Sequence, residues 1–161
     1  MAHHHNFYTK LTAKWLIEQN SIDLIGTEIG FNDSIFDVIG ISTQPRSVPK
    51  ISIVEVKVQR PDLLQDLRKR KMLKYEKYAS HCYLAATKEA FAFTDLDSLL
   101  LDLEGRGLPN HWGILLLPNS SSSGVTCLRK ARALKKPNEL FIQKLIILIA
   151  RSYMYKTLLK D

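Results

Sequence analysis

Glu55 and Lys57 stand two residues apart in one apolar segment, and an upstream apolar segment contains the lone acid Asp37. An acid and a base on otherwise apolar strands are costly to bury without a partner, so a functional role would account for them. Two carboxylates and a lysine that meet on a sheet can hold a divalent cation and stabilise the negative charge of a pentavalent phosphate. The pattern Asp…Glu-x-Lys therefore predicts a site that acts on phosphate esters.

The segment that carries Glu55 and Lys57 has the alternation of a β-strand. Residues 51–58 are rich in β-branched side chains, and side chains alternate between the two faces of a strand. One face would carry Ser52, Val54, Val56 and Val58, and the other Ile51, Ile53, Glu55 and Lys57. The pattern therefore predicts that the acid and the base lie side by side on one face.

The neighbouring segments predict the elements that would position these residues. Residues 7–19 indicate a helix with Asn6 as its N-cap and with Phe7, Leu11 and Trp15 as its apolar stripe. Residues 27–31 and 35–41 indicate a hairpin around an Asn-Asp turn. Residues 61–78 indicate a helix that begins at Pro61, and residues 81–86, apolar on both sides, indicate a central strand.

The second half of the chain predicts an extension of the same domain. We expect a short helix at 98–103, paired strands at 112–117 and 125–128, and a last helix from Asn138 to about 158. The buried stripe of the last helix would be Phe141, Leu145, Leu148 and Ile149. These elements predict a single domain over residues 1–161, with a core at about 7–86 and an extension at about 87–161.

Composition argues against a membrane protein and favours an anionic partner. The 161 residues contain no apolar run near the roughly 20 residues that span a bilayer, and we expect no signal peptide. Two cysteines without metal-ligand spacing suit a reducing cytoplasm. The net charge of +7 favours nucleic acid as a partner. His3, His4 and His5 suggest a tag remnant or a loose tail rather than a metal site.

Basic side chains gather in two segments of the chain. The first contains Arg68, Lys69, Arg70, Lys71, Lys74 and Lys77, and the second contains Arg129, Lys130, Arg132, Lys135 and Lys136. A single cluster of this kind is equally well explained as a solvated surface. Two clusters, one of which follows the Glu-x-Lys strand, favour phosphate binding.

The order helix, strand, strand, strand, helix, strand, with the acids placed on the second and third strands, resembles the PD-(D/E)XK nuclease superfamily. A wider set of segments resembles the MmcB-like DNA repair nucleases and their phage relatives. These segments are Glu28, Asp37, Glu55-Val56-Lys57, Arg60-Pro61-Asp62, residues 71–75, residues 82–85, residues 107–115 and residues 125–131. Phe36 stands where the superfamily name has a proline, a departure that many members share.

The resemblance implies a fold and a cofactor. The fold would be a restriction-endonuclease-like α/β core, in which helices flank a mixed central sheet, extended by a C-terminal β-hairpin and helix. The cofactor would be Mg²⁺, for which Mn²⁺ can substitute, held by Asp37, Glu55 and the backbone carbonyl of Val56. Lys57 would stabilise developing negative charge, and a role as base would need a pKa lowered by burial.

Three further acids are candidates for the same site. Glu28 is the candidate for an additional carboxylate, because it lies on the neighbouring strand and matches the family pattern. Glu18 on the first helix is the alternative, although it also fits a solvated last turn. Asp62 fits the acid that stabilises a helix N-terminus better than a metal ligand.

Candidate DNA contacts follow the Glu-x-Lys strand and comprise Arg60, Arg68, Lys69, Lys71, Lys74 and Tyr75. A helix in this position could present them to the phosphate backbone, whose recognition needs charge more than exact geometry. The equally weighted alternative is that Tyr75 packs on the sheet while the lysines are solvated.

The sequence therefore predicts a metal-dependent DNA nuclease, an endonuclease of DNA repair, recombination or phage DNA processing. The substrate would be DNA, in the cytoplasm of a bacterium or a phage-infected cell, and a junction-resolving enzyme would be a homodimer with two active sites. One alternative is a DNA-binding module on the same fold that does not cleave. Another is a protein-interaction subunit in which Glu55 and Lys57 form only a buried salt bridge.

Overall fold

The computed structural model describes residues 2–20, 22–43, 48–119, 123–135 and 137–158, so Lys136 lies outside the described residues. Its centre is a single six-stranded sheet in the order β1-β2-β3-β4-β5-β6. The strands are β1 Leu24–Phe31, β2 Ser34–Ser42, β3 Lys50–Lys57, β4 His81–Thr87, β5 Gly113–Leu117 and β6 Thr126–Arg129. β3, β4 and β5 run parallel, and every other neighbouring pair is antiparallel, so the sheet is mixed.

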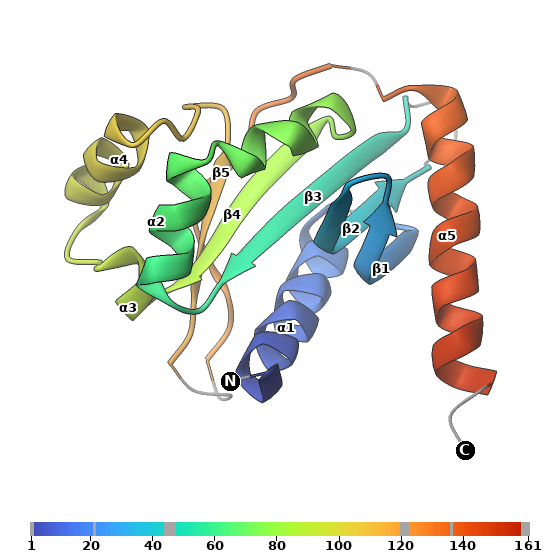
Figure 1. Cartoon of the computed structure of the whole chain (residues 1–161), viewed down its shortest axis with the longest axis horizontal. Coiled ribbons are helices and arrows are strands. Elements are labelled where there is room, and N and C mark those ends of the chain that lie inside the picture. Colours follow the sequence, from blue (N-terminus) through green and yellow to red (C-terminus); the bar gives the residue numbers. More distant parts are fainter. Residues whose placement is uncertain (1, 21, 44–47, 120–122, 136, 159–161) are drawn as a thin grey trace.

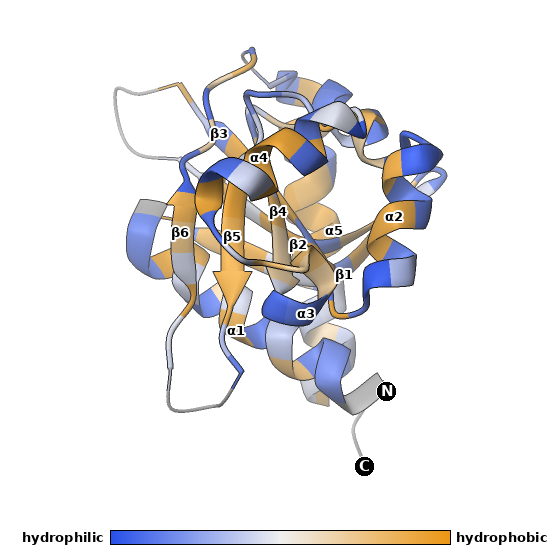
Figure 2. Ribbon diagram, turned by 90° about the vertical axis from the view of Figure 1, so that its left-hand side faces the viewer, coloured by the Kyte–Doolittle hydropathy of each residue, from blue (hydrophilic) through white to orange (hydrophobic). Residues whose placement is uncertain are grey.

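Helices cover both faces of the sheet, as Figure 1 shows. α1 Ala2–Asn20 packs through Tyr8, Ala13 and Leu16 on the face that carries Val54 and Val56. The opposite face is covered by α2 Arg60–Arg68, the 3₁₀ helix η1 Lys71–Lys77, α3 Lys88–Phe91, α4 Leu96–Gly105 and α5 Glu139–Leu158. Figure 2 shows hydrophobic strands in the middle and hydrophilic segments on the outer sides of the helices.

The structure confirms the predicted α/β class with a mixed sheet flanked by helices, and the C-terminal hairpin and helix are present. β4 lies between β3 and β5, and six of its seven residues are buried, as its two-sided apolar pattern predicted. The described residues contain no helix that is long and apolar enough to cross a membrane.

The first helix differs from its prediction at its start and on its buried face. It begins at Ala2, so Asn6 is not its N-cap and the histidines are not a loose tail. Phe7 is 38% exposed, whereas Thr9 and Thr12 are buried. The Thr12 hydroxyl donates to the carbonyl of Tyr8 at 2.7 Å, a local hydrogen bond that lets a polar side chain face the sheet. The spacing of apolar residues alone could not predict that threonines, rather than Phe7, face the sheet.

The single helix predicted at 61–78 is broken into α2 and η1. Arg70 lies between them with a left-handed backbone, at φ 51°. The change of direction buries Leu63 and Leu67 from α2 and also Met72 and Tyr75 from η1, which one straight helix could not do. The break therefore follows from packing against the sheet.

The hairpin of β1 and β2 departs from strict alternation at Glu28, which has a left-handed backbone at φ 54°. The residues on either side of Glu28 pair with those on either side of Asp37, but Glu28 and Asp37 themselves are not a strand pair. Phe36 and Ile39, three residues apart, both belong to the core on the α5 side. Beyond the pair of Val38 with Val54, β2 and β3 no longer pair residue by residue. Asp37 therefore lies at the point where β2 separates from β3.

Candidate active site

The two predicted metal-binding acids lie on neighbouring strands where β2 and β3 separate. Asp37 Oδ2 accepts a hydrogen bond from the backbone N–H of Val56 at 2.8 Å, so its carboxylate is held against the Glu-x-Lys strand. Glu55 is 3% exposed and lies on the same face as Ile51 and Ile53, as the alternation predicted. Burial and the negative charge of Asp37 raise the pKa of Glu55 to about 7, although the ammonium of Lys57 opposes them.

The ammonium of Lys57 lies between two carboxylates. Its Nζ is 2.8 Å from Glu55 Oε1 and 2.5 Å from Asp66 Oδ2. Burial lowers the pKa of Lys57, but the negative charges of Glu55 and Asp66 outweigh burial and raise it above its usual value. Lys57 is therefore a fixed positive charge, and this arrangement does not support its use as a base.

Asp66 is a member of the site that the sequence analysis missed. It lies on α2, one turn after Asp62, and its side chain is 13% exposed. Lys71 at the start of η1 is 3.6 Å from the same Asp66 oxygen that contacts Lys57. The available signal was the position of Asp66 three residues after the buried Leu63 and next to the buried Leu67. Residues three apart share a face of a helix, so Asp66 lies toward the side of α2 that faces the sheet.

His5 is a second member of the site that sequence reasoning misses, because residues 3–5 suggest a tag or a loose tail. Its Nε2 is 3.6 Å from Asp37 Oδ1. Hydrogen bonding to Asp37 raises the pKa of His5 against the effect of burial, and the charges of Asp37 and Glu28 add to the rise. α1 therefore brings its N-terminal end to the acids of β1 and β2.

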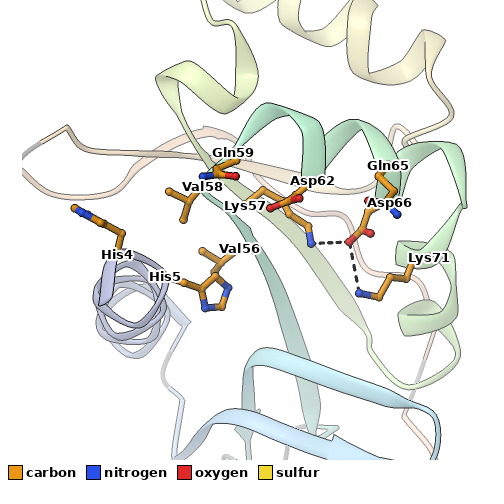
Figure 3. A pocket seen from close by; sticks show the side chains of 10 residues that line it. All are labelled: His4, His5, Val56, Lys57, Val58, Gln59, Asp62, Gln65, Asp66 and Lys71. Carbon is orange, nitrogen blue, oxygen red and sulfur yellow. Dashed lines mark ion pairs between the residues drawn. The ribbon is translucent and has the colours of Figure 1, made fainter. Parts of the chain in front are cut away.

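A pocket of about 450 Å³ lies between the N-terminal end of α1, the end of β3, and α2 (Figure 3). Lys57, Asp66 and Lys71 line it, with Asp62 and Gln65 of α2 beside them and His5 on the α1 side. Neither Asp37 nor Glu55 is in this lining. His5 in the lining contacts Asp37, and Lys57 in the lining contacts Glu55. A ligand in the pocket would thus contact Lys57 directly, whereas Asp37 and Glu55 lie outside the lining.

The donors around Asp37 and Glu55 suit a hard cation with few protein ligands. Glu55 Oε2 is buried and has no hydrogen-bond partner among the described residues. Those residues contain no group of three or more His, Cys, Asp or Glu side chains placed to hold a metal. Mg²⁺ keeps several waters and needs only one or two carboxylates, so Asp37, Glu55 and the main chain of Val56 fit it. Mn²⁺ accepts the same oxygen donors.

The other candidate acids differ in their distance from the site. Glu18 pairs with Lys14 at 3.9 Å, and thirteen helical residues put it roughly 20 Å along α1 from His5. Glu28 is exposed, but its charge acts on His5, which places it near Asp37. Asp62 lines the pocket and is also the acid in the first turn of α2. The geometry favours Glu28 over Glu18 as the additional carboxylate.

Two of the candidate DNA contacts are engaged elsewhere. Tyr75 is 1% exposed, its ring centroid is 5.4 Å from that of Phe36, and its hydroxyl donates to the carbonyl of Ile35 at 3.2 Å. Its prediction as a DNA contact is wrong for this structure, and the packing alternative holds. Arg60 is 3.4 Å from Asp102 and donates to the carbonyl of Ala90, so it ties α2 to α3 and α4.

Three of the four remaining candidates line two adjoining hollows, and Lys74 lines neither. Lys71 lines the pocket, and Lys74 pairs with Asp33 at 3.4 Å. Arg68 and Lys69 line a second groove of about 610 Å³ on the outer side of α2, and neither has an acidic partner among the described residues. Gln65 lines both hollows, so the groove continues from the pocket.

The second basic cluster is partly structural. Arg129 lies 2.5 Å from Glu104 and donates to the carbonyl of Trp112 at 2.9 Å, which joins β6 to α4 and to the start of β5. Arg132 donates to Asn110 at 2.8 Å. Lys130 and Lys135 are exposed. The two arginines therefore join elements of the fold, and the exposed lysines fit the solvated-surface interpretation.

No protein-family model matches the chain, and no curated protein matches its sequence. Among solved structures, the chain is similar to the SPO1766 protein of unknown function from Silicibacter pomeroyi. The similarity covers 96% of this chain and 92% of the other, with 17% sequence identity and a TM-score of 0.64. At that identity the similarity shows a shared fold and nothing about activity.

Proposed function

We propose that this protein is a metal-dependent deoxyribonuclease of the PD-(D/E)XK superfamily, with a restriction-endonuclease-like core. The observation that carries the proposal is the state of Glu55, a buried carboxylate with one oxygen that has no hydrogen-bond partner among the described residues. Burial and the negative charge of Asp37 raise the pKa of Glu55, and Lys57 contacts it. Such an arrangement is costly for stability alone and is typical of functional sites. An endonuclease of DNA repair, recombination or phage DNA processing fits the pocket and the basic groove.

The residues present can divide the work of phosphodiester hydrolysis. A divalent cation supplies charge neutralisation and an activated water when it is bound, and Asp37, Glu55 and Val56 would hold it. Lys57, which points into the pocket, would stabilise the negative charge that develops on the phosphate. The hydrogen bond from Val56 to Asp37 keeps that carboxylate oriented toward β3.

The outer groove would hold the DNA backbone that continues from the pocket. Arg68 and Lys69 have no acidic partner among the described residues, so their charges are available to phosphates. Lys71 is available at the pocket, although Asp66 lies 3.6 Å from it. A homodimer belongs to the proposal only for a junction-resolving enzyme, which needs two active sites.

The second candidate is a DNA-binding module on the same fold that does not cleave. One observation favours it: the pocket is lined by Lys57 and His5 and not by the two carboxylates behind them. In a cleaving enzyme, a cation on Glu55 would compete with Lys57, which lies 2.8 Å from that carboxylate.

A buried salt bridge without catalytic use explains less. The contact of 2.8 Å between Lys57 and Glu55 is what that hypothesis expects. A purely structural ion pair is stabilising only when its remaining polar atoms are satisfied, and Glu55 Oε2 is not. The hypothesis also leaves Asp37 and the adjoining basic groove without a role.

The test is cleavage of a labelled panel of DNA substrates (duplex, single strand, flap and four-way junction) with Mg²⁺. We expect cleavage that EDTA abolishes and that Lys57→Ala reduces at least about a hundredfold, the size expected for loss of one oriented charge-stabilising group. Lys50→Ala, at the other and exposed end of β3, is the matched control and should retain activity. Tight binding without cleavage of any substrate would support the binding module instead.

A further inference from the structure

Asp66 is a partly buried acid on α2, the helix that follows the Glu-x-Lys strand. Its Oδ2 is 2.5 Å from the ammonium of Lys57 and 3.6 Å from that of Lys71. The side chains of Lys57 and Asp66 are 12% and 13% exposed, so the pair is largely shielded from water. Figure 3 shows Lys57 and Lys71 converging on Asp66 at the wall of the pocket.

Lys57 needs an anchor other than Glu55 if Glu55 is to bind a cation. A buried ammonium is stable only next to negative charge, and a carboxylate that shares its charge with a cation attracts the ammonium less. Asp66 approaches Lys57 from α2, whereas Glu55 approaches it from within β3. Lys57 therefore has one partner on the side of the proposed metal site and one on the side of the pocket.

We infer that Asp66 is a positioning residue, which holds the Lys57 ammonium at the pocket wall where the phosphate of a bound substrate would meet it. The inference rests on the proposed nuclease function for its catalytic consequence. The placement of Lys57 by Asp66 is a separate claim that can be tested without activity.

Asp62 offers a matched control for charge and location. It lies one turn earlier on α2, lines the same pocket, and has no basic partner among the described residues. Asp62→Asn and Asp66→Asn thus remove the same charge from the same hollow. Only the second removes a contact with Lys57.

The kinetic test compares Asp66→Asn, Asp66→Glu and Asp62→Asn in Mg²⁺-dependent DNA cleavage. We expect Asp66→Asn to lower kcat by about ten- to a hundredfold with KM changed less than about threefold, because the lost interaction matters in the transition state. Asp66→Glu, which keeps the charge, should recover most of the loss, and Asp62→Asn should stay near wild type. Equal effects of the two asparagine variants, or a change in KM alone, would overturn the inference.

A second readout separates this inference from the proposed nuclease activity. An acetylating reagent reacts only with the unprotonated amine, and a neighbouring carboxylate keeps Lys57 protonated. The rate of Lys57 modification, measured by mass spectrometry at one mildly alkaline pH, therefore reports the loss of such a carboxylate. We expect at least about fivefold faster modification of Lys57 in folded Asp66→Asn and no change in Asp62→Asn, whether or not the wild type cleaves DNA. An unchanged rate in Asp66→Asn would refute the placement of Lys57 by Asp66. If this rate changes but no variant cleaves, the nuclease proposal fails and the placement stands.

Discussion

At the scale of residues, Glu55 is an acid whose charge is poorly solvated. Its side chain lies among buried apolar neighbours on the α5 side of the sheet, and Asp37 adds a second negative charge nearby. Lys57 compensates only in part, so the pKa of Glu55 rises to about 7. The folded protein therefore holds a proton at Glu55 over a pH range in which the unfolded chain has released it.

This difference predicts a falling stability as the pH rises. Between pH 4.5, the ordinary pKa, and about 7, the folded state binds more protons than the unfolded state, so the free energy of unfolding decreases over that window and is level above it. Relative to wild type, Glu55→Gln should therefore gain about 1 to 3 kcal/mol between about pH 5 and about pH 8 in the metal-free protein. Urea denaturation at the two pH values measures it.

Glu28→Gln, which changes an exposed carboxylate on the neighbouring strand, is the control for this measurement. Its stability difference from wild type should vary little between the two pH values. A Glu55→Gln difference that is equally constant would show that Glu55 is ionised in the folded state throughout and that its burial has no such cost.

The sequence could predict the pair of Glu55 and Lys57 on β3 but not all the side chains around it. Alternation places Glu55 and Lys57 on one face, and their apolar neighbours indicate burial. Asp66 and His5 come from two helices on opposite faces of the sheet, and their approach depends on how α1 and α2 pack. Helical periodicity indicates which side of a helix is buried, but not which strand position that side meets.

At the scale of elements, the break between α2 and η1 shapes the surface that we propose binds DNA. The left-handed Arg70 ends the run of charges on α2 and turns the chain so that η1 begins at the pocket with Lys71. Arg68 and Lys69 remain on the outer groove, joined to the pocket through Gln65. In the proposed complex, a phosphate backbone would run from Lys71 of η1 across α2 to Arg68 and Lys69.

The groove predicts a change in the salt dependence of DNA binding. Removing two phosphate contacts with Arg68→Ala and Lys69→Ala should weaken binding and reduce the slope of log K against log salt by about 2. Arg151→Ala with Lys144→Ala on α5 removes the same two charge types from exposed positions on another helix. Fluorescence anisotropy over a salt series compares the two double variants, and equal slopes would contradict the groove as the DNA path.

The break itself was beyond prediction from periodicity. Residues 62–78 contain no glycine or proline that would mark a break, and a cationic residue such as Arg70 gives no signal for a left-handed backbone, unlike glycine or asparagine. Packing against the sheet sets the bend, because it buries Leu67 before the break and Met72 and Tyr75 after it.

At the scale of the whole molecule, one sheet places the site where two structural layers meet. β3 pairs antiparallel with β2 and parallel with β4, so the Glu-x-Lys strand is central and its end opens between α1 and α2 (Figure 1). Alternation, the Asn-Asp turn and the crossover through α2 made this part of the topology predictable. The docking of α5 against β1 was not, because its apolar stripe indicates burial without indicating the partner.

The most direct test of the account is a paired measurement of binding and cleavage by Asp37→Asn, on whichever substrate of the DNA panel the wild type cleaves. The variant keeps the size of the side chain and removes one of the two carboxylates proposed to hold the cation. We predict that it binds that DNA within about threefold of wild type in Ca²⁺ or without metal, and that its Mg²⁺-dependent cleavage falls by at least about a thousandfold. Cleavage near the wild-type rate, with binding unchanged, would contradict an active site built on Asp37, Glu55 and Lys57.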